Sequence, residues 1–118
     1  MQRKGILIVE DDEDIREALA LVLENEGYPV FSASNGKEGL DLFPTLPDLC
    51  LILLDLMMPV MDGFEFLVAR KQDVKLSKVP VVVISAFPER ARELAADGCL
   101  KKPIQVNDIL NYINQHCT

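Results

Sequence analysis

The segment Leu49–Asp55, with the sequence LCLILLD, contains six consecutive apolar residues followed by one carboxylate. A strand with one solvated face alternates apolar and polar residues, and this run has no such alternation. Burial on both faces is typical of a strand in a parallel sheet that is covered by helices on two sides. Because an unpaired buried charge is costly, Asp55 must leave the core at the strand end or meet a cation.

Apolar segments and amphipathic segments alternate along the rest of the chain. Strands are predicted at residues 5–10, 29–34, 49–55, 79–85 and 99–103. Helices are predicted at residues 14–27, 35–43, 62–72, 88–98 and 105–116. This alternation indicates β-α units with right-handed crossovers. The expected fold class is therefore α/β: a three-layer, doubly wound, five-stranded parallel sheet with five helices.

The spacing of apolar residues predicts which helix faces pack on the sheet. The predicted inward-facing residues are Ile15, Ala18, Leu19, Val22 and Leu23 in the first helix, Phe64, Leu67 and Val68 in the third, and Val106, Ile109, Leu110 and Ile113 in the last. Gly27 is predicted to end the first helix, because glycine is favoured just past a helix C-terminus.

Length and composition limit the classes of protein that this chain can belong to. At 118 residues with 49% hydrophobic residues, residues 1–118 are expected to form a single domain. No apolar run reaches the about 18 to 20 residues of a membrane helix, so no membrane partner is expected. The net charge of −7 argues against nucleic-acid binding by the chain itself and suits a basic protein partner or a cation site.

The three cysteines, Cys50, Cys99 and Cys117, fit neither a metal-binding CxxC spacing nor a disulfide framework. Cys50 is expected to be a core residue, and Cys117 is expected to be inert in a frayed C-terminal turn. The expected compartment is therefore the reducing cytoplasm.

Polar residues stand at four of the predicted strand ends, and in a parallel sheet these ends share one edge, where ligands bind. They are Glu10, Asp11 and Asp12 after the first strand, Asp55 at the third, Ser85 at the fourth, and Lys101 and Lys102 before Pro103 at the fifth. If the first and third strands are neighbours, these carboxylates lie close together and repel one another unless a cation neutralises them. Mg²⁺, which prefers oxygen ligands, is the expected cofactor.

Acids, Mg²⁺, a hydroxyl group and a lysine are the components of a phosphoryl-transfer site. Asp55 is the candidate nucleophile, and Asp11 with help from Glu10 is the candidate metal site. Ser85 would bind a phosphoryl oxygen, and Lys102 would pair with the carboxylate or the phosphate. Each also has a structural alternative: the acids could favour a helix N-terminus, Ser85 could cap the next helix, and Lys102 could be an ordinary surface residue.

Four motifs in order, ILIVEDDEDIREAL, LLDLMMPVMDGFEFL, VPVVVISA and LKKPI, resemble the receiver domain of two-component response regulators, of the stand-alone, chemotaxis-regulator-like kind. The resemblance implies a flavodoxin-like strand order 2-1-3-4-5. It also implies that Asp55 is the phosphoacceptor for a histidine kinase or a histidine phosphotransfer protein. Mg²⁺ would be bound by the acidic pair Glu10 and Asp11, by Asp55 and by the backbone carbonyl of Met57. Ser85 matches the family's switch residue, and Lys102 matches its lysine.

Two features depart from the family pattern. Cys99 stands where members usually carry an aromatic switch residue, three positions before Lys102. The segment between Ser85 and Lys102 is shorter than is usual, so the fourth helix is expected to be short and the output face altered.

The resemblance implies a signalling phosphoacceptor, and not an enzyme in the ordinary sense, which assists its own phosphorylation and dephosphorylation. Its output would pass through contact with an unidentified protein or through a phosphorylation-linked homodimer. One alternative is an interaction module that keeps the fold and is not phosphorylated. The other is an aspartyl-phosphate phosphohydrolase of the haloacid dehalogenase type. That class needs a second acid two residues after the nucleophile, where this chain has Met57.

Overall fold

The computed structural model describes residues 3–91, 94 and 96–118. Five parallel strands form one sheet in the order β2-β1-β3-β4-β5, which confirms the flavodoxin-like fold. The strands are β1 (Gly5–Val9), β2 (Val30–Ala33), β3 (Leu49–Asp55), β4 (Val81–Ser85) and β5 (Gly98–Lys101). Strand β3 lies at the centre between β1 and β4, and every residue of it is buried, as the unbroken apolar run predicted.

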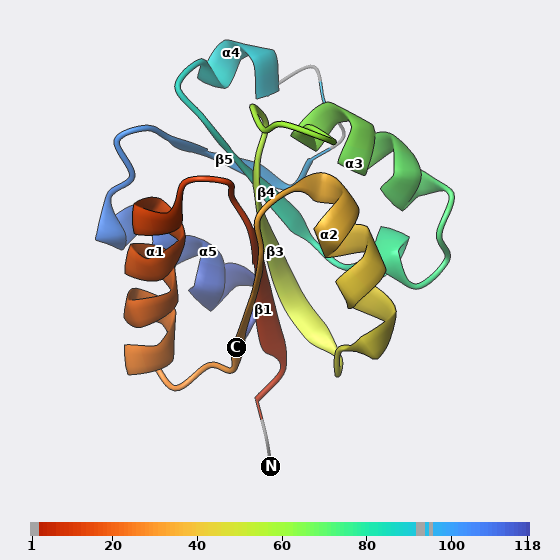
Figure 1. Cartoon of the computed structure of the whole chain (residues 1–118). Coiled ribbons are helices and arrows are strands. Elements are labelled where there is room, and N and C mark those ends of the chain that lie inside the picture. Colours follow the sequence, from red (N-terminus) through yellow and green to blue (C-terminus); the bar gives the residue numbers. More distant parts are fainter. Residues whose placement is uncertain (1–2, 92–93, 95) are drawn as a thin grey trace.

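Helices cover both faces of the sheet, so the molecule has three layers (Figure 1). One face carries α1 (Glu13–Asn25) and α5 (Val106–His116), and the other carries α2 (Gly36–Leu42), α3 (Gly63–Lys71) and α4 (Pro88–Ala91). Two short 3-10 helices, η1 (Phe43–Thr45) and η2 (Leu76–Lys78), precede β3 and β4.

The core is divided into two hydrophobic clusters, one on each face of the sheet. In β1 and β3, Leu7 and Ile52 pack on the α2–α3 side, whereas Ile8 and Leu53 pack on the α1–α5 side. Successive residues of a strand point to opposite faces, so a strand that feeds both clusters must be apolar throughout. Among the described residues, none of the helices combines the length and the apolar character needed to cross a membrane.

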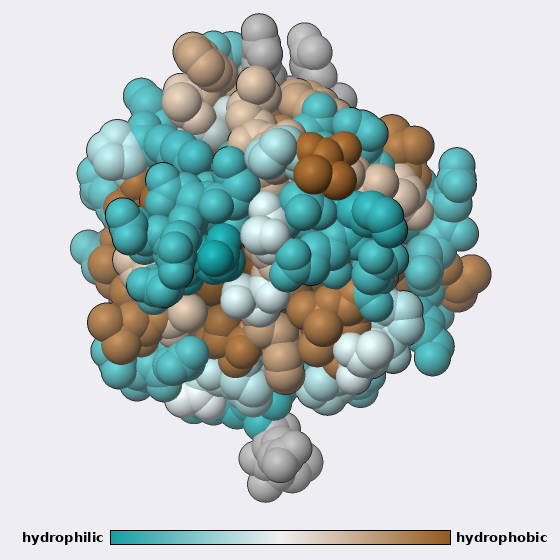
Figure 2. All heavy atoms as spheres, in the orientation of Figure 1, coloured by the Kyte–Doolittle hydropathy of each residue, from teal (hydrophilic) through white to brown (hydrophobic). Residues whose placement is uncertain are grey.

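Three residues that were predicted to face the sheet are exposed in the structure. Val68 is 60% exposed, and the neighbouring Phe66, fully buried, takes the inward place on α3. Val106 is 49% exposed because it is the first residue of α5. Ala18 is also exposed, since α1 rests on the sheet through Leu19 and Leu23. Figure 2 shows one side of the molecule, with hydrophobic side chains in patches between hydrophilic ones.

Helix termini follow the local sequence signals. The side chains of Asp12, Asn35 and Asp62 accept hydrogen bonds from backbone N–H groups in the first turns of α1, α2 and α3. Gly27 has a φ of 89° directly after α1, and its N–H donates to the carbonyl of Glu24. The prediction that Gly27 ends α1 is therefore confirmed.

The helix predicted over residues 88–98 is described only in part. Helix α4 spans Pro88–Ala91, whereas residues 92, 93 and 95 lie outside the described residues. Leu94 and Ala96 pack against the hydrophobic core, and β5 begins at Gly98, one residue earlier than predicted. The helix therefore does not extend to Gly98.

The prediction that the cysteines form no disulfide, and that Cys117 is inert, was wrong. Cys50 and Cys117, 67 residues apart in the sequence, form a disulfide bond between β3 and the C-terminal end of α5. Cys99 is a free thiol. An odd number of cysteines cannot reveal such a pair, because the pairing depends on the fold bringing α5 back across the beginning of β3.

Candidate functional site

An acidic cluster lies at the carboxyl ends of β1 and β3. Because these strands are neighbours, with Val9 beside Leu54, the residues that follow them meet at one edge of the sheet. Glu10, Asp11 and Asp55 each offer a carboxylate oxygen, and these atoms lie within 4.8 Å of one another. Glu10 is fully buried and Asp55 is 2% exposed, whereas Asp11 is exposed.

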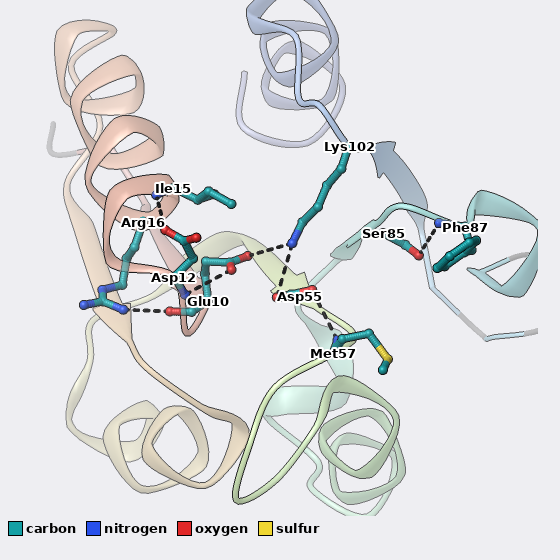
Figure 3. Close-up of polar contacts among 9 residues, drawn as sticks. All are labelled: Glu10, Asp12, Ile15, Arg16, Asp55, Met57, Ser85, Phe87 and Lys102. Atoms are coloured by element: carbon teal, nitrogen blue, oxygen red, sulfur yellow. Dashed lines mark hydrogen bonds and ion pairs between the residues drawn. The ribbon is translucent and has the colours of Figure 1, made fainter.

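Lys102 supplies a cation to this cluster. As Figure 3 shows, its Nζ atom lies 3.5 Å from Oδ2 of Asp55 and 3.9 Å from Oε2 of Glu10. The backbone N–H of Lys102 donates to the carbonyl of Ser85, which holds the residue directly after β5. The peptide bond between Lys102 and Pro103 is cis. One lysine therefore faces two buried carboxylates, which leaves the cluster with net negative charge.

Burial and the crowding of these carboxylates shift the pKa of Glu10. The pKa of its carboxyl group is raised to about 8, first by burial and next by the charge of Asp55, against a smaller lowering effect of Lys102. Its Oε1 atom accepts a hydrogen bond from the N–H of Asp12 at 3.2 Å. Its Oε2 atom is buried and has no hydrogen-bond partner in the described part of the chain. The raised pKa favours the protonated form of Glu10 at neutral pH when no metal cation shares the site.

The loop between β3 and α3 packs tightly around Asp55. Oδ1 of Asp55 accepts the N–H of Met57 at 3.2 Å. A Cβ atom on Gly63 would lie 2.5 Å from the carbonyl oxygen of Asp55, so only glycine fits there. Val60 has a φ of 68°, which is rare for a β-branched residue, and the adjacent N–H of Met61 donates to Pro59 at 2.8 Å. This loop therefore fixes the backbone directly after the acid.

Ser85 is buried at the end of β4, on the strand next to Asp55. Its Oγ atom accepts the N–H of Phe87 at 2.9 Å, just before α4 begins at Pro88 (Figure 3). This bond to the residue two positions further on is a serine turn before α4 and not a helix cap, so the capping alternative stays a prediction. The strand order brings Ser85 to the same edge of the sheet as Asp55.

Arg16 was not identified from the sequence, and Asp12 was named only among the acids after the first strand. Asp12 holds Glu10 through its N–H and also caps α1 by accepting the N–H of Ile15 at 3.1 Å. Arg16, one helical turn further on, donates from Nη1 to the carbonyl of Glu10 at 2.8 Å (Figure 3). The i, i+4 spacing of Asp12 and Arg16 was the available signal, because such residues share one helix face.

The backbone of Cys99 contacts the side chain of Tyr112, which lies on α5. The hydroxyl of Tyr112 on α5 accepts the N–H of Cys99 at 3.1 Å and donates to its carbonyl at 3.2 Å. A Cβ atom on Gly98 would lie 2.3 Å from the Tyr112 ring. The ring therefore packs directly on the backbone of β5, although β5 itself carries no aromatic residue.

The donor set fits a divalent cation that prefers oxygen. Three carboxylates converge, and the buried Oε2 of Glu10 has no hydrogen-bond partner among the described residues. Mg²⁺ is commonly bound by one or two carboxylates together with water and phosphate oxygens. The site therefore suits Mg²⁺ by its chemistry.

A doubly wound sheet of order 2-1-3-4-5 with an acidic cluster and a lysine at its carboxyl edge defines the CheY-like class of α/β proteins. The profile described as "Response regulator receiver domain" matches residues 6–114, and the chain belongs to this family. It is thus a receiver domain of two-component signalling.

Known proteins agree with this assignment. The chain is 40% identical over 107 residues to response regulator RR06 of Streptococcus pneumoniae, which covers 86% of the chain and 48% of RR06. The chain therefore spans about half the length of this relative. The structure of the Vibrio cholerae chemotaxis protein CheY4 matches with a TM-score of 0.87 and 28% identity, covering 97% of this chain and 98% of that one.

A third match bears on the ligand chemistry of the family. Response regulator TrrA from Thermotoga maritima, solved in complex with Mg²⁺-BeF, has a TM-score of 0.82 and 29% identity, covering 95% of this chain and 97% of TrrA.

Proposed function

We propose that residues 1–118 form a single receiver domain that accepts a phosphoryl group on Asp55 in a Mg²⁺-dependent reaction. The donor is a phosphohistidine of a histidine kinase or of a histidine phosphotransfer protein. The observation that carries this proposal is the meeting of Glu10, Asp11 and Asp55 within 4.8 Å, with Lys102 3.5 Å from Asp55. The Mg²⁺-BeF complex of TrrA supports the choice of metal.

In the proposed reaction, a carboxylate oxygen of Asp55 attacks the phosphorus atom. The bond between phosphorus and the donor imidazole nitrogen breaks, and an acyl phosphate forms. Mg²⁺, held by Glu10, Asp11, Asp55 and the carbonyl of Met57, would neutralise charge on the phosphoryl oxygens. Lys102 orients Asp55 and balances negative charge.

Signal output follows from the change of charge at Asp55. Ser85 exchanges its hydrogen bond to Phe87 for a phosphoryl oxygen, which shifts the segment between β4 and α4. This movement switches a protein-binding surface, and a homodimer formed on phosphorylation is one form that the output can take. The acidic chain suits a basic protein partner in the cytoplasm and does not suit nucleic acid.

Intact-mass measurement after incubation with acetyl phosphate tests the proposal. We expect wild-type protein with Mg²⁺ to gain the mass of one phosphoryl group, and to gain none when EDTA removes the metal. Asp55→Asn should gain none in either condition. Asp62→Asn is the matched control, because asparagine caps a helix as well as aspartate does. A wild-type protein that stays folded and unmodified would favour the interaction module that is not phosphorylated.

Slow loss of the phosphoryl group is a second expectation. Met57 and Phe87, two residues beyond Asp55 and Ser85, are both more than half exposed and offer an attacking water no side-chain hydrogen bond. We expect a lifetime longer than seconds, and a shorter one in a Met57→Asn, Phe87→Asn double variant. Loss of mass over time after removal of acetyl phosphate measures both. Equal lifetimes would refute the role of these side chains.

The phosphohydrolase alternative lacks a required residue. An aspartyl-nucleophile hydrolase of the haloacid dehalogenase type uses a general acid two residues after the nucleophile. This position holds Met57, whose thioether cannot supply a proton. The geometry therefore favours a phosphoacceptor.

A further inference from the structure

The disulfide between Cys50 and Cys117 joins the central strand β3 to the C-terminal end of α5. Cys50 is buried near the beginning of the central strand β3, and Cys117 is half-buried directly after α5. The remainder of α5 is attached to the sheet through the buried side chains of Ile109 and Ile113. The bond therefore secures the last turn of α5, beyond the apolar contacts of the helix.

The surroundings of Cys50 accommodate the reduced form as well. Its Sγ atom lies 3.6 Å from the carbonyl oxygen of Gly5 and 3.8 Å from that of Lys4. A thiol at Cys50 can donate its S–H to either oxygen, so reduction does not leave a buried donor unsatisfied. In the disulfide-bonded form, the N–H of Cys117 donates to the carbonyl of Ile113 and closes the last turn of α5.

The disulfide lies away from the acidic cluster. Cys50 is five residues before Asp55 on an extended strand, a separation of roughly 17 Å along the sheet. Figure 1 accordingly shows the C-terminus beside the lower part of the sheet, whereas the loops after β1 and β3 lie at the upper edge. Changes at Cys117 can therefore alter α5 without moving the groups around Asp55.

We propose that Cys50 and Cys117 form a reversible thiol–disulfide site that attaches or releases the C-terminal turn of α5. The proposal rests on the cytoplasmic setting of the proposed function, a setting that no longer rests on the cysteine spacing, because Cys50 and Cys117 are paired. Disulfides in that compartment are usually transient and catalytic or redox-sensing. The redox state of the pair acts on α5, while phosphorylation acts at Asp55. The domain thereby has two independent inputs.

The oxidant belongs to the class of small-molecule disulfides, such as glutathione disulfide. The thiolate of Cys117, the more accessible sulfur, attacks this disulfide and releases one small thiol. The thiolate of Cys50 then attacks the Cys117 sulfur of the mixed disulfide and releases the second small thiol. Two protein thiols lose two protons and two electrons in total, and one small disulfide becomes two thiols.

Equilibration of the full chain in glutathione buffers of graded reducing strength tests the site. Alkylation of free thiols and intact mass count the thiols, and peptide mapping identifies the linked pair. We expect one free thiol, Cys99, under oxidising conditions and three under reducing conditions. The oxidised form should have an apparent Tm higher by roughly 10 °C or more, because the bond closes a 67-residue segment. Reduction should also remove hydrogen-exchange protection from the last turn of α5.

Two variants separate the pair from the other effects of reduction. Cys99→Ser should keep the dependence of Tm on redox state, whereas Cys117→Ser should lose it and show the lower Tm throughout. Both should take up a phosphoryl group from acetyl phosphate at the wild-type rate. Three free thiols in every buffer, or a bond that persists in strongly reducing glutathione, would overturn the proposal. Unchanged Tm and α5 exchange on reduction would overturn it as well.

The readouts distinguish this proposal from the proposed function. Thiol pairing without phosphoryl uptake would leave the redox site standing and reject the phosphoacceptor. Phosphoryl uptake with three unpaired thiols would support the phosphoacceptor and reject the redox site.

Discussion

Replacing Lys102 with methionine slows phosphoryl uptake from acetyl phosphate by roughly 10² to 10³-fold, the usual cost of removing one charged group from such a site. The Nζ atom of Lys102 lies within 4 Å of both Asp55 and Glu10. Without it, the two buried carboxylates lose the ammonium group that lies within 4 Å of both. Methionine keeps most of the length and volume of the side chain, so the loss reflects the charge. Initial rates from intact mass measure the effect.

Lys101 provides the matched control for this experiment. It is an exposed lysine on β5, directly before Lys102, and Ser85 is its partner in the strand register. Lys101→Met removes the same charge from the chain and should retain the wild-type rate within about twofold. Equal rates for both variants would show that the cation at Lys102 plays no part in the chemistry.

The metal-free protein becomes less stable as the pH rises from about 4.5 to about 8 because of Glu10. Its carboxyl pKa is about 8 in the folded protein and takes its ordinary value of 4.5 in the unfolded chain. Between these values the folded state binds more protons than the unfolded state, so the free energy of unfolding falls with pH. The loss is complete above about pH 8 and is on the order of a few kcal/mol.

Denaturant unfolding of wild type and Glu10→Gln across this pH range checks the prediction. Glutamine keeps the shape of the protonated acid and does not ionise, so the variant should lack the Glu10 contribution to the slope and be the more stable protein at high pH. Mg²⁺ should restore stability at high pH to wild type more than to the variant. Parallel stability profiles for the two proteins would show that Glu10 does not titrate in this range.

The fold class could be predicted because the apolar patterns of the strands have a simple physical cause. A short unbroken apolar run is typical of a strand with two covered faces, and β3 indeed lies at the centre of the sheet between β1 and β4. Parallel strands place their carboxyl ends along one edge, and the strand order implied by the resemblance to receiver domains is why Glu10 and Asp55 could be expected to meet.

Other features depend on three-dimensional details that no local pattern contains. Phe66 and Val68 are both apolar but lie on nearly opposite sides of α3, and the apolar pattern alone did not decide which of them faces the core. The bond between Cys50 and Cys117 depends on where α5 ends relative to β3. The contact of Arg16 with the carbonyl of Glu10 depends on a side-chain rotamer, which the sequence does not specify.

The most direct test of the account is chemical mapping of the phosphorylated residue. Borohydride reduces an aspartyl phosphate to homoserine, and peptide mass spectrometry then locates that homoserine in the chain. After incubation with acetyl phosphate and Mg²⁺, we expect homoserine at position 55 and aspartate at every other acidic position of the site. Homoserine at Asp11 or Asp12 with position 55 unchanged would contradict the assignment of Asp55 as the phosphoacceptor.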